Sequence, residues 1–239
     1  MKYVLLFTFL VLTRTSHGQE LTGRALLEKA IAYHDPNDQW EMFNAQMQIE
    51  METPKNSLRR TEVSINLPAD YFKTIVIKAN DTIISELDKG KCSLALNGST
   101  TIDQNMRDSL RINCDRTNMM KNYYTYLYGL PMKLKDPGTI VAEKVTRKTY
   151  KGKEYLVLKA EYDKDVGNDT WYFYFDPETF AMEVYQFFHD ETKNDGEYIL
   201  LSELVEVSGI KIPKVRAWYY NKDDHYLGTD TLQEATAGF

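Results

Sequence analysis

The sequence lacks an excess of positive charge. Its 239 residues include 29 lysines and arginines against 35 aspartates and glutamates, which gives a formal net charge of -6. A nucleic-acid-binding surface neutralises phosphates with clustered Lys and Arg side chains, so this balance argues against nucleic acid as a partner. Hydrophobic residues make up 43% of the chain, enough to build a core, and this excludes an intrinsically disordered protein.

Long apolar runs are also lacking outside the N-terminus. Residues 3–12 form a short apolar run behind Lys2, too short to cross a bilayer as a helix, which takes about 20 residues. A polar stretch follows, with small residues at Ser16 and Gly18, where a signal peptidase reads the chain. The pattern predicts a signal peptide over residues 1–18, cleaved before Gln19. The alternative is a buried N-terminal helix or strand.

Cleavage at this point changes the charge and length of the working chain. It would leave 221 residues and, because residues 1–18 contain Lys2 and Arg14 but no acid, a net charge of -8. No later run is long and apolar enough to anchor the chain in a membrane. We therefore expect an exported protein without a transmembrane anchor, located in the periplasm or outside the cell.

Known catalytic and cofactor motifs are absent from the sequence. It contains no Gly-x-Ser-x-Gly elbow, no Gly-x-Gly-x-x-Gly turn and no phosphate-binding loop. Three histidines follow the predicted signal peptide, His34, His189 and His225, each beside an acid but without the close spacing typical of a zinc site. Solvated turns are the favoured interpretation of all three. We expect a protein that is not an enzyme and that uses no metal or cofactor.

Cysteine occurs only at Cys92 and Cys114. An even number of cysteines in a protein bound for an oxidising compartment favours a disulfide. The bond would close a loop of 22 positions, worth about 3 kcal/mol in the chain-entropy model, and tie a predicted strand to a predicted helix. The sequence leaves open the alternative of two buried free thiols.

The apolar residues that are present follow helical and strand periods in turn. Thr22 is a candidate N-cap for an amphipathic helix that ends before Pro36. Apolar and polar residues then alternate from Ala45 to Met51, the period of a strand with one wet face. Four further strands are predicted up to Leu96, so this part of the chain is predicted to form a helix followed by a five-strand meander.

The middle of the chain differs, because apolar residues at three- and four-residue offsets predict a second helical region over residues 103–130. Strands are then predicted over residues 140–148, 154–162, 170–175, 181–188, 198–207, 210–220 and 225–232. The fold class is therefore mainly β (α+β). We expect one large curved antiparallel sheet or half-open barrel of about 11–12 strands, with an N-terminal helix and a mid-chain helical lid. No linker or repeat divides residues 19–239, which we expect to form a single domain.

Three stretches of the sequence carry a resemblance to a known family. They are YHDP at residues 33–36, NYYTYLYGLPMKLKDPG at residues 122–138 and FDPET at residues 175–179. Together they resemble the DUF6503 family of exported Bacteroidetes proteins of unknown function, which is similar to the LolA/LolB-like group of periplasmic lipoprotein carriers. The resemblance implies a LolA-like half-barrel whose concave apolar face is closed by helices and can hold acyl chains. It implies no mechanism, because the narrower family has no assigned activity.

Aromatic side chains are the most informative candidates for a binding site. Residues 171–175 place large rings on both faces of one predicted strand, and such a strand must be covered on both faces. These rings either fill an ordinary core or line a ligand cavity under the mid-chain helix, whose methionines would adapt to an irregular apolar ligand. The candidate cavity lining is Met119, Tyr123, Leu127, Trp171, Phe173, Phe175, Tyr185, Phe187 and Trp218.

Two functional hypotheses follow. The first is an exported, non-catalytic periplasmic binding or carrier protein that holds a lipid, an acyl chain or another apolar small molecule in the concavity of the half-barrel. The alternative is an interaction or assembly module whose aromatic strands dock a cell-envelope protein.

Overall fold

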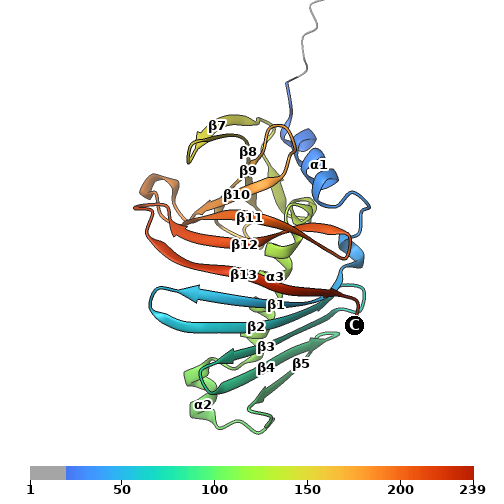
Figure 1. The fold of residues 1–239 in the computed structure, drawn as a ribbon, viewed down its shortest axis with the longest axis vertical. Coiled ribbons are helices and arrows are strands. Elements are labelled where there is room, and N and C mark those ends of the chain that lie inside the picture. The colour runs from blue at the N-terminus through green and yellow to red at the C-terminus, as the bar shows by residue number, and fades with distance from the viewer. Residues whose placement is uncertain (1–19) are drawn as a thin grey trace, which may run out of the picture.

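One antiparallel sheet of thirteen strands dominates the computed structural model, which describes residues 20–239 (Figure 1). The strands are β1 (Asn44–Thr53), β2 (Asn56–Asn66), β3 (Tyr71–Lys78), β4 (Asp81–Asp88), β5 (Lys91–Leu96), β6 (Thr139–Val141), β7 (Thr146–Tyr150), β8 (Lys153–Tyr162), β9 (Thr170–Phe175), β10 (Met182–Phe188), β11 (Glu197–Val207), β12 (Ile210–Tyr220) and β13 (Tyr226–Ala237). Their order is β5-β4-β3-β2-β1-β13-β12-β11-β10-β9-β8-β6, and β7 also pairs with β8. The sheet curves without closing, and the predicted signal peptide lies outside the described residues.

Helices cover one face of this sheet, which we call the concave face. Helix α1 (Gly23–His34) packs against β8 and β12, α2 (Gln104–Leu110) precedes α3 (Cys114–Gly129), and α3 passes behind the sheet in Figure 1. Three short turns of 3-10 helix are η1 (Trp40–Met42), η2 (Met132–Lys135) and η3 (Glu191–Lys193). Leu26 of α1, Leu127 of α3 and Phe173 of β9 belong to one hydrophobic core. None of the helices formed by residues 20–239 is both long and apolar enough to span a membrane.

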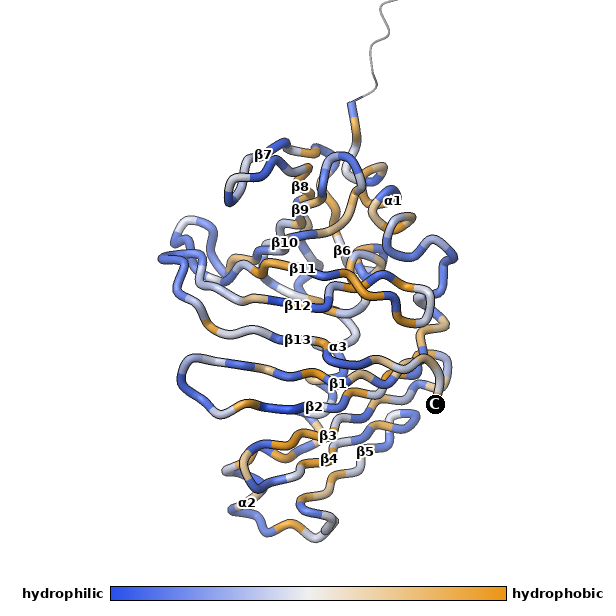
Figure 2. Tube along the Cα trace, viewed as in Figure 1, coloured by the Kyte–Doolittle hydropathy of each residue, from blue (hydrophilic) through white to orange (hydrophobic). Residues whose placement is uncertain are grey.

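The first and last strands of the chain pair in the middle of the sheet. Strand β1 pairs with β2 on one side and with β13 on the other, so that Met47 lies opposite both Val63 and Ala235. Ala45, Met47 and Ile49 are buried on the concave face, and the polar residues between them point to the convex face. Figure 2 shows this alternation of hydropathy along the strands. The period-2 pattern therefore sets which face of the sheet becomes the core.

The predicted helical region over residues 103–130 is divided into two helices. Arg111 has a left-handed backbone (φ 55°) directly after α2, which ends that helix. The Asn113 side chain then accepts a hydrogen bond from the Arg116 amide and begins α3 (2.8 Å). The mid-chain region is thus a short helix and a long one that meet at a sharp turn.

The strand expected over residues 140–148 is also divided, into β6 and β7, and the sheet therefore has thirteen strands rather than 11–12. The break receives the start of α1, where the Gly23 amide donates to the Glu143 carbonyl (2.7 Å). A Cβ atom on Gly23 would lie 1.9 Å from the Ala142 carbonyl oxygen, so this close approach requires glycine. Sequence periodicity cannot reveal such a break, because a distant helix produces it.

The aromatic strand β9 is covered on both of its faces. Phe173 is fully buried in the main core on the concave side. On the convex side, Tyr174 packs against Tyr150 at the end of β7 and Tyr155 on β8, with ring centroids 5.0 and 5.8 Å apart. Val157 joins them in a second, smaller core. The outward-facing rings of β9 are thus covered largely by the chain itself.

His34 is a buried structural residue, and its interpretation as part of a solvated turn is wrong. It is 0% exposed at the end of α1. Its Nε2 accepts a hydrogen bond from the Met182 amide (2.9 Å), so its Nδ1 carries the proton and donates to the Lys211 carbonyl (2.7 Å). The neutral ring thereby ties α1 to β10 and β12, two strands that are remote from it in the sequence. In residues 20–239 no group of three or more His, Cys, Asp or Glu side chains could hold a metal ion.

The buried, neutral His34 ring makes the stability of the fold depend on pH. Burial lowers the pKa of His34 from its usual 6.5 to about 4. As the pH falls from 6.5 towards 4, the unfolded chain takes up a proton at His34 that the folded chain refuses, so stability decreases. We expect a loss of about 2 kcal/mol at about pH 5 relative to neutral pH, measured by urea unfolding. His34→Asn should be less stable throughout and should lack this component of the pH dependence, whereas His225→Asn, at an exposed position, should retain it. An unchanged slope in His34→Asn would contradict the assignment.

Candidate ligand-binding site

Helix α3 occupies the concavity of the sheet. Tyr124 and Leu127 on this helix are only 4% and 5% exposed. Pairs of aromatic rings join the helix to the sheet. The ring centroid of Tyr124 lies 6.3 Å from that of Phe72, and the Tyr123 ring stacks on Trp218 with a centroid distance of 6.5 Å. The space beneath the middle of α3 is therefore filled by the protein's own side chains. The open clefts lie beside the helix.

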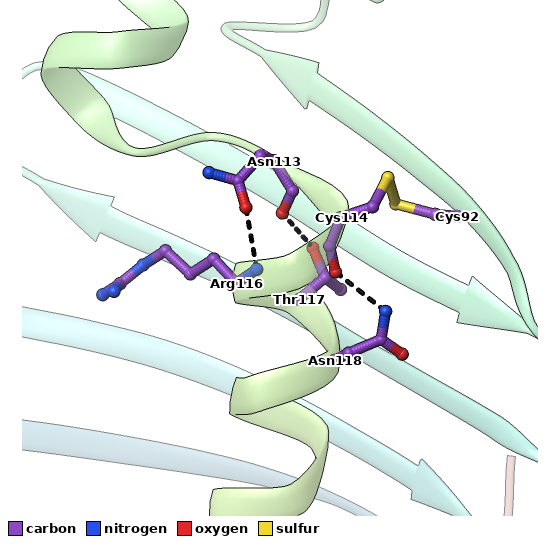
Figure 3. Close-up of a disulfide and its surroundings, with 6 residues drawn as sticks. All are labelled: Cys92, Asn113, Cys114, Arg116, Thr117 and Asn118. Atoms are coloured by element: carbon purple, nitrogen blue, oxygen red, sulfur yellow. Dashed lines mark hydrogen bonds between the residues drawn. A yellow bond between two sulfur atoms is a disulfide. The ribbon is translucent and has the colours of Figure 1, made fainter.

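One disulfide and one hydrogen bond hold the start of α3 in place (Figure 3). Cys114, its first residue, forms a disulfide with Cys92 of β5, with a Cα–Cα distance of 5.9 Å. Next to it, the Asn113 carbonyl accepts a hydrogen bond from the Thr117 hydroxyl (3.0 Å). The N-terminal end of α3 is therefore attached to the edge of the sheet that is formed by β4 and β5.

The first cleft, which we call the aromatic cleft, lies between the C-terminal half of α3 and strands β8 and β9. Its volume is about 390 Å³, within the usual range for small-molecule pockets. The Tyr126 ring contacts those of Tyr162 and Trp171, at centroid distances of 6.4 and 5.5 Å. The remaining lining residues are Asn122, Thr125, Lys133, Asp136, Pro137, Thr139, Val166, Gly167 and Asp169. Three aromatic rings thus form one wall, with polar groups around the opening.

The hydroxyls of two tyrosines in the aromatic cleft bind each other. Their hydroxyls form a hydrogen bond of 2.5 Å. Burial raises the pKa of the Tyr126 hydroxyl well above its usual value and that of Tyr162 to about 12, so both stay protonated at neutral pH. Because one hydroxyl donates to the other, a single O–H donor is left over, and the rest of the wall presents carbon to a ligand.

The second cleft, which we call the basic cleft, lies on the other side of α3 and has a volume of about 260 Å³. Four cationic residues line it, Arg59, Lys78, Arg111 and Arg116, together with a single carboxylate, Asp81. The other lining residues are Thr61, Thr74, Val76, Ile83, Ser85, Ser109, Leu110, Ile112, Asn113, Thr117, Met120 and Tyr124. The cleft therefore combines an excess of positive charge with hydroxyl groups and an apolar wall.

A buried charge lies between the sheet and α3. Arg216 on β12 is 1% exposed, and its Nη1 donates to the Pro213 carbonyl (3.0 Å) while the guanidinium lies 4.1 Å above the Tyr128 ring. Its Nε and Nη2 have no hydrogen-bond partner in the part of the chain that the structure describes. Asp230 lies directly opposite on β13 and is 7% exposed. Burial raises the pKa of Asp230, while Arg59 and Arg216 act in the opposite direction.

Comparison with known proteins assigns the chain to a family. A family model described as "Family of unknown function (DUF6503)" matches residues 1–235, almost the whole sequence. The chain belongs to the DUF6503 family. No curated protein matches it.

Three solved structures share the fold of this DUF6503 protein. A LolA superfamily protein from Nitrosomonas europaea has a TM-score of 0.53 at 10% identity, covering 90% of this chain and 93% of the other. A putative outer membrane lipoprotein-sorting protein domain from Vibrio parahaemolyticus has a TM-score of 0.50 at 10% identity, with coverages of 89% and 90%. A DUF1329 family protein from Desulfovibrio piger has a TM-score of 0.50 at 8% identity, with coverages of 92% and 94%. These likenesses establish a LolA-like fold and nothing finer.

The residues predicted to line a cavity in this DUF6503 protein lie in several environments. Trp171 lines the aromatic cleft, and Phe187 stacks on it at 4.9 Å. The Tyr123 ring of α3 and the Tyr185 ring of β10 both contact Trp218, at centroid distances of 6.5 and 6.4 Å, so these three rings gather between α3 and the sheet.

The other four predicted lining residues lie elsewhere. Leu127, Phe173 and Phe175 are buried in the main core. Met119 is 51% exposed on α3. The structure therefore brings together the rings around Trp218 and the rings around Trp171, but it does not unite all nine residues in one cavity.

Sequence reasoning missed the charged residues of the DUF6503 site. Arg216 lies two positions before Trp218 and therefore on the same face of its strand. An arginine flanked by the apolar residues Val215 and Ala217 was the available signal. The basic cleft had no such signal, because its four cations lie in β2, β3, the turn after α2, and α3.

Proposed function

We propose that this protein is an exported, non-catalytic binding or carrier protein that holds a lipid, an acyl chain or another apolar small molecule in a cleft of its concave face, beside α3, with residues 19–239 as the working domain. The observation that carries this proposal is the aromatic cleft, an opening of about 390 Å³ beside α3 with Tyr126, Tyr162 and Trp171 as its wall. The signal-peptide pattern of residues 1–18 supports export to the periplasm. The LolA-like fold supports a carrier-type role.

The chemistry of the aromatic cleft suits an apolar ligand. Each square ångström of apolar surface removed from water contributes roughly 25 cal/mol before ordering costs are subtracted. The ring of Trp171 is only partly buried by its neighbours and can be covered further by a ligand. A ligand longer than the cleft would have to displace the C-terminal half of α3, since the disulfide at Cys114 holds the other end.

Binding of a fluorescent fatty acid to the purified protein tests this proposal. We expect saturable binding, and Trp171→Ala should weaken it by about tenfold because the largest ring of the wall is lost. Native mass spectrometry after gentle extraction should in addition reveal a ligand that copurifies with the protein.

Tyr172→Ala is the matched control, because Tyr172 adjoins Trp171 on β9 but points to the opposite face, where its hydroxyl donates to Glu191. This variant should bind the fatty acid as the wild type does. No copurifying ligand together with no fatty-acid binding, or an equal loss in both variants, would contradict the proposal.

The alternative, a module that docks a cell-envelope protein through its aromatic strands, has less support. The outward-facing Tyr174 is fully buried, with Tyr150 and Tyr155 packed on it, so this ring is not offered to a partner. Crosslinking that recovers one protein partner and no lipid would favour the alternative.

A further inference from the structure

The cations of the basic cleft lack partners within the protein. Among residues 20–239, none of Arg59, Lys78, Arg111 and Arg116 forms an ion pair with a carboxylate. The one carboxylate in the cleft, Asp81, accepts a hydrogen bond from the Asn97 side-chain amide (3.1 Å). This concentration of positive charge occurs in a chain whose formal net charge is -6.

Of the four cations in the basic cleft, Arg59 has the guanidinium group that would gain most from a bound anion. Its Nε is enclosed by the protein and has no hydrogen-bond partner in the described part of the chain. The adjacent Arg60, in contrast, points to the other face of β2, where its Nε lies 2.7 Å from Glu50. A buried donor without an acceptor is costly, and an anionic oxygen is the acceptor that a guanidinium binds best.

The interior next to Arg59 offers no anion that serves this arginine alone. The charge of Arg59 acts on the buried carboxylate of Asp230, but Asp230 also faces Arg216 across the β12–β13 pair. Two arginines thus share one buried acid. The hydroxyls of Thr61, Thr74 and Ser85 line the same cleft and can donate to a further oxygen.

We propose that the basic cleft binds a phosphate group, with Arg59 and Arg116 as its main partners and the apolar wall of Val76, Ile83 and Met120 receiving a short organic substituent. The phosphate is either a free ion or the head group of an amphiphile, since both offer the same oxygens. This site lies on the opposite side of α3 from the aromatic cleft, so it goes beyond the proposed apolar binding and can succeed or fail independently of it.

Calorimetric titration of the purified protein with inorganic phosphate, and cosedimentation with vesicles, test the proposal. The vesicles are phosphatidylcholine alone or phosphatidylcholine with phosphatidic acid, which exposes a phosphate monoester. We expect binding to inorganic phosphate, to the phosphatidic acid vesicles, or to both. The first result alone identifies a free ion as the source, and vesicle binding identifies a head group. The acidic net charge of the chain opposes non-specific attraction to anionic vesicles.

Single variants assign the binding to the cleft. Arg59→Gln should weaken the observed binding by about tenfold, and Arg60→Gln, the same change on the opposite face of the strand, should leave it unchanged. If Arg59→Gln does not fold, Arg116→Gln, at an exposed position on α3, provides the same measurement. The absence of binding in both assays, or an equal loss in Arg60→Gln, would overturn the proposal. Fatty-acid binding in the aromatic cleft should persist in every one of these variants.

Discussion

Asp230→Asn is expected to lower the free energy of unfolding by about 3 kcal/mol, because it removes a buried carboxylate whose charge acts on the buried Arg216 and so leaves that cation uncompensated. Asp230 is the carboxylate opposite Arg216 on the neighbouring strand, and both side chains are almost completely buried. A guanidinium cannot lose its proton in a protein, so Arg216 would keep its charge with no acid beside it. Urea unfolding of wild type and variant near neutral pH measures the difference.

The converse substitution should cost less. Arg216→Met retains much of the buried side-chain volume and leaves Arg59 as the other cation that acts on Asp230. The carboxyl group can in addition become neutral by binding a proton. Burial already raises the pKa of Asp230, and removal of Arg216 would raise it further. We expect a loss of about 1 kcal/mol for Arg216→Met, and this ranking of the two variants is the specific prediction.

An exposed ion pair on the neighbouring strands is the control for this comparison. Lys214 on β12 lies 3.1 Å from Glu203 on β11, and the Glu203 side chain is 62% exposed. Glu203→Gln should change stability by less than about 0.5 kcal/mol. A larger loss for Arg216→Met than for Asp230→Asn would show that the guanidinium acts through packing and hydrogen bonding rather than through its charge.

Removal of the disulfide is the second large effect that we expect. The double variant Cys92→Ser, Cys114→Ser should unfold with a free energy lower by about 3 kcal/mol, because the bond closes a loop with a sequence separation of 22. The loop contains all of α2 and begins on β5, so the unfolded chain gains freedom over a segment that is otherwise held at the sheet edge. Urea unfolding in the absence of reductant measures the loss.

Reductant supplies an internal control for the disulfide. Wild type in dithiothreitol should approach the stability of the double variant, and the double variant itself should not respond to dithiothreitol. Because the bond attaches the first residue of α3, its loss should also expose the backbone amides at the start of α3 to faster hydrogen exchange than those near Leu127. Equal stability of double variant and wild type would contradict the chain-entropy argument for this loop.

Local patterns predicted the elements of this fold well, and long-range contacts produced the differences. The alternation from Ala45 to Met51 identified β1 and its buried face, because period-2 hydropathy depends only on neighbouring residues. The break between β6 and β7 could not be predicted, since it exists to receive Gly23 of α1. The buried state of His34 escaped prediction for the same reason, as its partners Lys211 and Met182 are far away in the sequence.

The candidate site shows the same contrast between what local patterns predict and what long-range packing decides. Trp171 was selected from the sequence as a ring in an aromatic strand, and it does line a cleft. Phe173 was selected by the same criterion and is fully buried in the main core. Composition and periodicity report which side chains face inward, whereas the position of an opening depends on what packs over them.

By itself, the sequence determined that this chain is a mainly β protein with an N-terminal helix, a helical middle and a strand with aromatic rings on both faces, because each of these features is encoded in residues that are close together along the chain. The tertiary structure alone decided where the clefts lie and which charges meet. Arg59, Arg116, Arg216 and Asp230 come from β2, α3, β12 and β13. Only the register of the sheet and the packing of α3 across it bring these four side chains to the same region of the concave face.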